Sequence, residues 1–144
     1  MKILTLVTGL LVSGIGFMLS YDAASLQINP NDFSNNFQFT LQNTTVQIST
    51  YGIITHKGYV FTFSNVNISI IIAVNDSRTE VASQNKTYTL APKDSVNVSF
   101  TFNIPMSVYL SADGWYILVF VHGSMTYRNY NFVDFALTTS REVS

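Results

Sequence analysis

The chain has 144 residues, of which 47% are hydrophobic and 10% are charged, and its net charge is −1 at pH 7. The near-zero charge excludes the basic field that nucleic-acid binding requires, and high hydrophobicity with few charges argues against intrinsic disorder. The absence of cysteine excludes disulfides, thiolate metal sites and cysteine nucleophiles. The 11 Phe and 8 Tyr favour strands over helices.

An apolar run, ILTLVTGLLVSGIGFML, occupies residues 3–19. Its length lies at the lower limit for a helix that spans a bilayer and exceeds that of most signal-peptide cores. Signal peptidase requires small residues at positions −3 and −1, whereas a cut after Ala23 or Ala24 would place Tyr21 or Asp22 at −3. We therefore expect a retained helix, in the membrane or in a filament core, with a cleaved secretory signal as the alternative.

The residues that flank and line this run indicate its orientation and packing. Lys2 precedes it and Asp22 follows it, so the positive-inside rule predicts that the rest of the chain lies outside the cell. Gly9, Ser13 and Gly16 share one face of the expected helix, and small residues on one face let helices approach closely. We predict a helix-packing face at these three residues. The alternative is that glycine and serine are simply common in such segments.

The order of a short basic region and an apolar helix resembles that of type IV pilins and their archaeal relatives. In that family a peptidase cuts just before the helix, after a basic residue and a small residue. Lys2 is followed here by Ile3. The resemblance therefore concerns the layout, and the cleavage motif departs from the family pattern.

Residues after 24 alternate between apolar and polar over short runs, as in half-buried strands. The first inward faces consist of Phe37, Phe39 and Leu41; Val46 and Ile48; Tyr59, Phe61 and Phe63; and Val66, Ile68, Ile70, Ile72 and Val74. The clearest run is SVNVSFTFNIP, where apolar residues from Val96 to Ile104 share one face and Pro105 ends the strand. WYILVFV (residues 115–121) is apolar on both faces, as in a central strand, and YRNYNFVDFAL (residues 127–137) completes the set.

Turn-forming stretches separate these runs, among them Asn29-Pro30-Asn31-Asp32, Asn75-Asp76-Ser77 and Ser111-Ala112-Asp113-Gly114. About eight strands at regular spacing predict an all-β fold, an immunoglobulin-like antiparallel β-sandwich. We assign it to residues 23–144, after one hydrophobic α-helix over residues 1–22. No helix is expected after residue 22.

Residues 89–121 carry a family resemblance, through Leu90, Pro92, Ser95, Pro105, Gly114 and Tyr116. Envelope and adhesion domains of the CARDB type often read Leu-x-Pro-Gly-x-Ser, an alternating strand, Pro, then Gly-x-Tyr and a last apolar strand. The chain resembles these modules, although Lys93-Asp94 replaces the usual Gly-Glu. The resemblance implies an immunoglobulin-like sandwich and leaves the function open, because such sandwiches host many functions.

The sequence offers no catalytic constellation. His56, placed in a turn, and His122, placed at a strand end, are the only histidines, and no third ligand at metal-binding spacing accompanies them. The nucleophile elbow Gly-x-Ser-x-Gly and phosphate-binding loops are absent from the sequence. We therefore expect no catalytic, cofactor or metal site and a protein that is not an enzyme.

The acceptor pattern N-x-[ST] is more informative, and it occurs at Asn43, Asn67, Asn75, Asn85 and Asn97. In an exported chain these asparagines are predicted N-glycosylation sites. The alternative is that a composition rich in Asn, Ser and Thr produces the pattern by chance.

The layout looks like that of archaeal surface proteins and is similar to the archaellum stator proteins F and G. In that family a pilin-like helix holds a β-sandwich head that binds the surface-layer lattice. The resemblance implies a cell-surface protein that is tethered to the membrane and binds an envelope protein or its own copies, with no nucleic acid and no small-molecule substrate. The alternatives are a secreted binding module, a pilin, and a donor-strand fibre subunit in which SLQINPNDF (residues 25–33) fills the sandwich of the next subunit.

Overall fold

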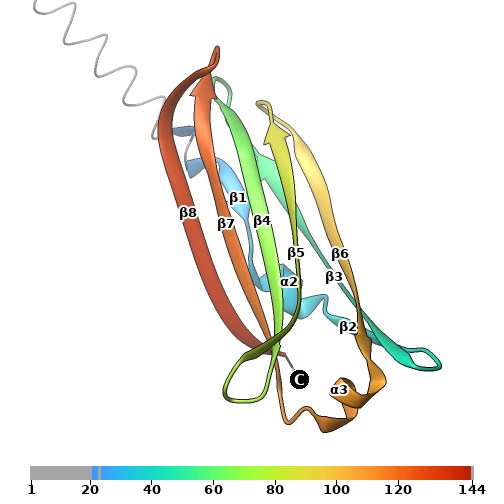
Figure 1. The fold of residues 1–144 in the computed structure, drawn as a ribbon. Coiled ribbons are helices and arrows are strands. Elements are labelled where there is room, and N and C mark those ends of the chain that lie inside the picture. Colours follow the sequence, from blue (N-terminus) through green and yellow to red (C-terminus); the bar gives the residue numbers. More distant parts are fainter. Residues whose placement is uncertain (1–20, 23, 144) are drawn as a thin grey trace, which may run out of the picture.

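The computed structural model describes residues 21, 22 and 24–143 (Figure 1). The predicted helix over residues 1–22 therefore lies almost wholly outside the described residues, and so do Gly9, Ser13 and Gly16. Within the described part of the chain, no helix is long and apolar enough to cross a membrane.

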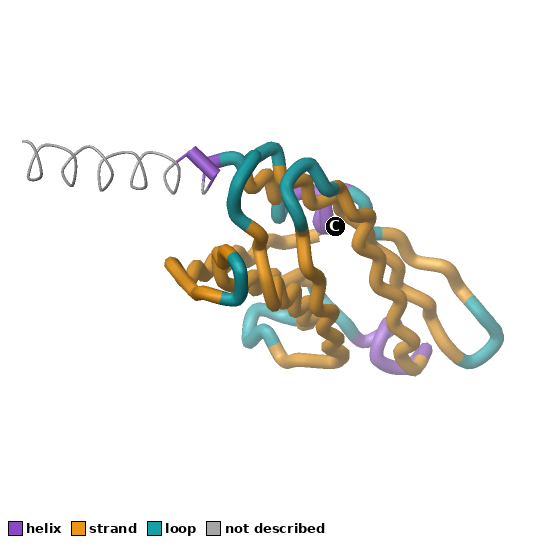
Figure 2. Tube along the Cα trace, turned by 90° about the horizontal axis from the view of Figure 1, so that it is seen from above, coloured by secondary structure: helices purple, strands orange, loops and turns teal. Residues whose placement is uncertain are grey.

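Strands make up most of the described chain (Figure 2). They are β1 (Leu26–Ile28), β2 (Gln38–Leu41), β3 (Thr45–His56), β4 (Thr62–Val74), β5 (Thr79–Leu90), β6 (Ser95–Pro105), β7 (Trp115–Tyr127) and β8 (Tyr130–Val143). Two short helices, α2 (Asn31–Asn35) and α3 (Met106–Ser111), interrupt them.

The strands form two antiparallel sheets. In the first, β3 pairs with β6 along nearly its whole length, so β1 and β2 lie one after the other on its opposite edge. The second sheet has the order β5-β4-β7-β8. The predicted all-β antiparallel sandwich is confirmed, and β7, the strand that is apolar on both faces, is central as predicted.

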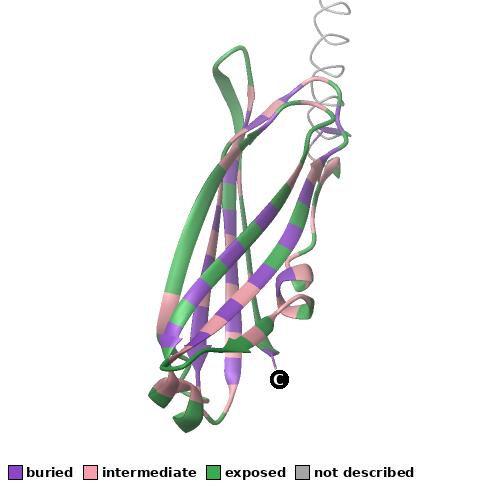
Figure 3. Ribbon diagram, turned by 90° about the vertical axis from the view of Figure 1, so that its right-hand side faces the viewer, coloured by how far each residue is buried: buried purple, intermediate pink, exposed green. Residues whose placement is uncertain are grey.

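The core lies between the sheets, because successive side chains of a strand point to opposite faces. Buried and exposed residues accordingly alternate along the strands (Figure 3). All predicted inward residues of β4 from Val66 to Val74 are buried, as are Val98, Phe100, Phe102 and Ile104 of β6. The alternating pattern thus identified the core faces of these strands correctly.

Several local predictions are wrong. Two helices occur where none was expected: in the first, Asn29 Oδ1 accepts the backbone N–H of Asn31 at 3.1 Å, and Phe33 of α2 is buried in the core. Leu41, the last residue of β2, was placed inside but is 62% exposed. Tyr59 is also exposed, since it lies in the loop before β4 and outside any strand.

The sandwich has two distinct ends (Figure 1). The end that we call proximal carries residues 21, 22, 24 and 25 and the turns 57–61, 91–94 and 128–129. Backbone hydrogen bonds join Lys57 to Ser25 and His56 to Asp94. The end that we call distal carries α3, the turns 75–78 and 112–114, and the end of β8.

Candidate functional site at the junction with the apolar segment

Asp22, which follows the apolar run by only a few residues, is built into the proximal end of the sandwich. Its side chain is 1% exposed. Oδ1 accepts the backbone N–H of Tyr59 at 3.2 Å, and Oδ2 accepts those of Val60 at 2.9 Å and Phe61 at 2.7 Å. Three successive N–H groups that converge on one anion form a backbone nest. The loop between β3 and β4 is therefore shaped around this carboxylate.

The nest favours the ionised form of Asp22. Burial by itself raises the pKa of the carboxyl group, because the charged form is desolvated. The hydrogen bonds from Phe61, Val60 and Tyr59 outweigh that effect and hold the pKa below its ordinary value. Asp22 is thus a buried anion at neutral pH, compensated by backbone dipoles.

His56 completes the nest from the end of β3. The sequence placed it in a turn, but it is the last residue of the strand and is fully buried. Its Nε2 lies 2.7 Å from the carbonyl oxygen of Phe61, and its Nδ1 accepts the N–H of Gly58 at 3.1 Å. This pattern fits a neutral ring with its proton on Nε2. Both ring nitrogens are engaged, so the side chain has a structural role in holding the loop.

Gly58 allows the close approach of these groups. A Cβ atom at this position would lie 2.7 Å from Cγ of Asp22 and closer still to Cε1 of His56. No side chain fits between the carboxylate and the ring. Local sequence does not reveal this requirement, because Asp22 lies far from Gly58 along the chain.

Further contacts join the start of the described chain to the same end. The ring of Tyr21 stacks on that of Tyr59 with centroids 5.9 Å apart. Lys93 Nζ lies 3.4 Å from the centroid of Tyr59 and donates to the carbonyl oxygen of Lys57 at 2.7 Å. The junction therefore combines a buried charged anchor with an outer aromatic and basic rim.

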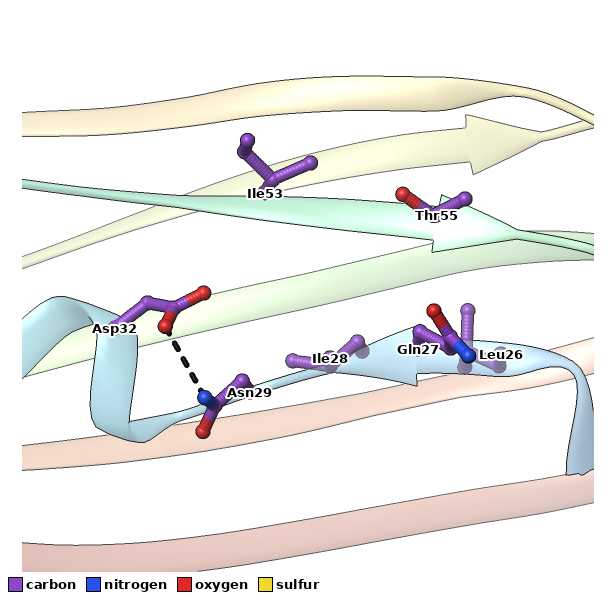
Figure 4. A pocket seen from close by; sticks show the side chains of 7 residues that line it. All are labelled: Leu26, Gln27, Ile28, Asn29, Asp32, Ile53 and Thr55. Carbon is purple, nitrogen blue, oxygen red and sulfur yellow. Dashed lines mark hydrogen bonds between the residues drawn. The ribbon is translucent and has the colours of Figure 1, made fainter.

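An open depression of about 450 Å³ lies beside β1 (Figure 4). It is lined by Leu26, Gln27, Ile28, Asn29, Asp32, Ile53 and Thr55. The only charged group among these seven residues, Asp32, accepts a hydrogen bond from Asn29 Nδ2 at 3.1 Å. The lining of the depression thus mixes apolar and polar side chains and contains no pair of nucleophile and base.

No group of three His, Cys, Asp or Glu that could hold a metal ion occurs among residues 21, 22 and 24–143. His122 was expected at a strand end, but it lies within β7 and is exposed, whereas His56 is buried at the proximal end. The structure therefore does not bring the two histidines into one site.

The five predicted glycosylation sites fall into two groups. Asn43, Asn85 and Asn97 are exposed. Asn67 and Asn75 are partly buried and engaged: Nδ2 of Asn67 donates to Thr87 at 3.0 Å, and Oδ1 of Asn75 accepts the N–H of Asp113 at 2.9 Å. The first group offers free side chains on the surface.

No protein-family model matches the chain, and no curated protein matches it. Solved structures with weak likeness include a β-glucuronidase of glycoside hydrolase family 2, with 16% identity and a TM-score of 0.41 over 71% of this chain and 10% of that one. A putative β-galactosidase from Bacteroides fragilis gives 9% identity and 0.43 over 78% and 17%. A protein from Archaeoglobus fulgidus gives 10% identity and 0.38 over 75% and 94%.

The chain thus spans only 10% and 17% of the two hydrolase chains. TM-scores below 0.5 at these identities carry no inference about the activity of this chain.

Proposed function

We propose that this chain is a non-enzymatic cell-surface protein whose immunoglobulin-like sandwich is tethered to the membrane by the apolar segment and binds another envelope component. The archaellum stator proteins and surface-layer anchors are the type of protein that we have in mind. The immunoglobulin-like interpretation is supported by the connections β3–β4, β5–β6 and β6–β7, each of which passes from one sheet to the other.

The burial of Asp22 is the observation that supports the proposed membrane tether. A signal peptidase cut after Ala23 or Ala24 would remove this residue and leave the three N–H groups of its nest without their acceptor. Unsatisfied buried donors cost about 1–3 kcal/mol. Because the sandwich needs residue 22 for its own stability, this contact favours a mature protein in which the apolar segment stays joined to the domain.

The same region bears on the donor-strand alternative. Within the described chain, residues 25–33 already belong to their own sandwich: β1 pairs with residues 54–56 of β3, and Phe33 is buried against Phe100. Thr50 Oγ1 also donates to the carbonyl oxygen of Phe33 at 2.5 Å. This arrangement favours a self-contained head over a subunit that lends the segment to a neighbour. A pilin, whose helix would pack in a filament core, remains the second candidate.

The experiment that tests the proposal is the N-terminal sequence of the native protein together with its fractionation. An intact apolar segment in the membrane fraction is the expected result. A mature N-terminus just before the apolar run, in protein from sheared filaments, would favour the pilin over the membrane-tethered protein. A mature N-terminus after residue 22, in protein from the culture medium, would overturn both the membrane tether and the pilin.

A further inference from the structure

The proximal end exposes an unusual set of aromatic side chains. Tyr59 and Tyr130 are 66% and 67% exposed, and Tyr21, Tyr127 and Phe132 are exposed as well. They come from the start of the described chain, the β3–β4 loop and the β7–β8 hairpin. The ring of Phe61 links the β3–β4 loop to the β7–β8 hairpin, because its centroid lies 6.1 Å from that of Tyr127 and 5.3 Å from that of Phe132. The rings form an aromatic surface around the Asp22 nest.

Basic side chains accompany these rings. Lys57 and Lys93 come from the proximal turns, and Arg128 lies at the tip of the β7–β8 hairpin, with its guanidinium 5.4 Å from the centroid of Tyr127. Among the acidic groups nearby, Asp22 is buried in its nest, whereas Asp94 is exposed and accepts the N–H of Ala91 at 3.0 Å.

The remaining acidic group near this end, Asp134, accepts hydrogen bonds from Ser124 and Asn131. At the distal end Asp76, Asp113 and Glu142 outnumber Arg78 and Arg141. The distal end is therefore net acidic, whereas the proximal end has as many basic as acidic side chains, of which one acidic side chain, Asp22, is buried.

Tyrosine rings and basic side chains together are typical of the interface between a membrane and water, where the rings lie at the level of the lipid headgroups. Lysine and arginine at that depth are attracted by anionic lipids. The described chain also enters the sandwich at this end, at Tyr21, two residues after the apolar run ends at Leu19. The aromatic and basic surface thus lies where a tethered chain meets its bilayer.

We propose that the proximal end rests on the membrane surface and binds anionic lipid headgroups through Tyr59, Tyr127 and Tyr130 together with Lys57, Lys93 and Arg128. This inference rests on the proposed tether and adds an orientation to it. The contact fixes the long axis of the sandwich, so that the distal end, with α3 and its acidic turns, points away from the bilayer toward its partner.

The test uses the full chain reconstituted in vesicles that contain phosphatidylglycerol and a lipid with a nitroxide on its headgroup. Because the sequence has no cysteine, Ala91→Cys labels the proximal end alone and Ser111→Cys labels the distal end alone. A fluorophore on residue 91 should be quenched several-fold more strongly than one on residue 111. The triple variant Tyr59→Ser, Tyr130→Ser and Arg128→Gln should lower the quenching at residue 91 to the distal level.

The matched control is Leu110→Ser with Arg78→Gln, which alters exposed distal residues and should leave the quenching at residue 91 unchanged. If the chain stays bound to the vesicles but both labelled positions are quenched equally, the surface contact is overturned. The membrane tether would not be affected by that result. Unchanged quenching in the triple variant would overturn the assignment of the residues. Excimer formation between labels on residue 91, without quenching by lipid, would replace the bilayer by a second copy of the chain. Failure of the chain to float with vesicles would overturn the tether itself.

Discussion

The carboxylate of Asp22 accepts a hydrogen bond of 2.7 Å from the backbone N–H of Phe61, a residue 39 positions further along the chain. Phe61 immediately precedes β4, and its ring is buried against Phe132 and Tyr127. One contact therefore joins the residue that follows the apolar segment to the start of a core strand and to the last hairpin.

Replacing Asp22 by alanine should lower the free energy of unfolding by about 2–3 kcal/mol, because three backbone N–H groups lose a charged acceptor in a buried site. The measurement is urea unfolding of the full chain in detergent, followed by the fluorescence of Trp115, the only tryptophan. Asp134→Ala is the control, since that carboxylate is exposed and its removal should change stability much less. Equal effects of the two substitutions would contradict the structural role of the nest.

The stabilisation by Asp22 should depend on pH in a defined direction. Its folded pKa lies below the ordinary value of 3.8, so the unfolded chain takes up the proton first as the pH falls. The contribution is complete above the unfolded pKa and is lost as the pH falls through the folded pKa. The difference in unfolding free energy between the native chain and Asp22→Asn should accordingly be constant from pH 7 to about pH 5 and shrink below about pH 4.

Asp134 titrates in the same direction, because hydrogen bonds from Asn131 and Ser124 lower its pKa. Both proteins carry this group, so its effect cancels in the difference between them. A difference that stays constant down to pH 2 would show that the charge of Asp22 contributes nothing.

Gly58→Ala should destabilise the fold by about 1–3 kcal/mol, because the added methyl group enters the contact between His56 and Asp22. Gly114→Ala provides the matched control: its Cβ would lie 3.7 Å from the nearest atom, on Tyr116, which is an ordinary contact distance. We expect the control to shift the thermal midpoint very little. A similar shift for both variants would argue against a tight nest.

Phe33→Ala should cost about 3–5 kcal/mol, the usual loss for a fully buried phenylalanine. The ring packs against Phe100 and fills the space that Gly52 leaves, where an added Cβ would lie 2.9 Å from Phe33 Cζ. Leu41→Ala removes a side chain that is mostly exposed and should have almost no effect. The unfolding midpoint should also be independent of protein concentration. A midpoint that rises with concentration would indicate that residues 25–33 pack in a neighbouring copy.

Glycosylation should follow the exposure of the acceptor asparagines. We expect glycopeptide mass spectrometry of native protein to find glycans at Asn43, Asn85 and Asn97. Asn67 and Asn75 should be modified less often or not at all, because their side chains are hydrogen-bonded within the fold. Modification confined to Asn67 and Asn75 would contradict this order, and five bare asparagines would remove the glycoprotein hypothesis.

The alternating pattern was sufficient to predict the core strands. In β6 the period of two places Val98, Phe100 and Phe102 on one face, and each is buried. The same pattern was insufficient at the ends of strands. Leu41 continues the alternation of β2 but is the last residue of that strand, and Tyr59 lies in a loop; both side chains are exposed.

Helix α2 shows another limit of local patterns. Asn29-Pro30-Asn31-Asp32 is a turn signal by itself, but in the structure it leads into α2, whose Phe33 is buried in the core. Likewise His56 follows the pattern of a turn residue, whereas the neighbouring loop folds over its ring and buries it.

The sequence by itself determined the all-β sandwich, the faces of its central strands and the position of the apolar run, because side-chain periodicity and local hydrophobicity are properties of neighbouring residues. Only the tertiary structure decided that Asp22 belongs to the sandwich. A carboxylate beside an apolar segment is locally only a flanking charge. It becomes a buried anchor when a loop 37 to 39 positions away turns three N–H groups toward it, and no local pattern encodes that approach.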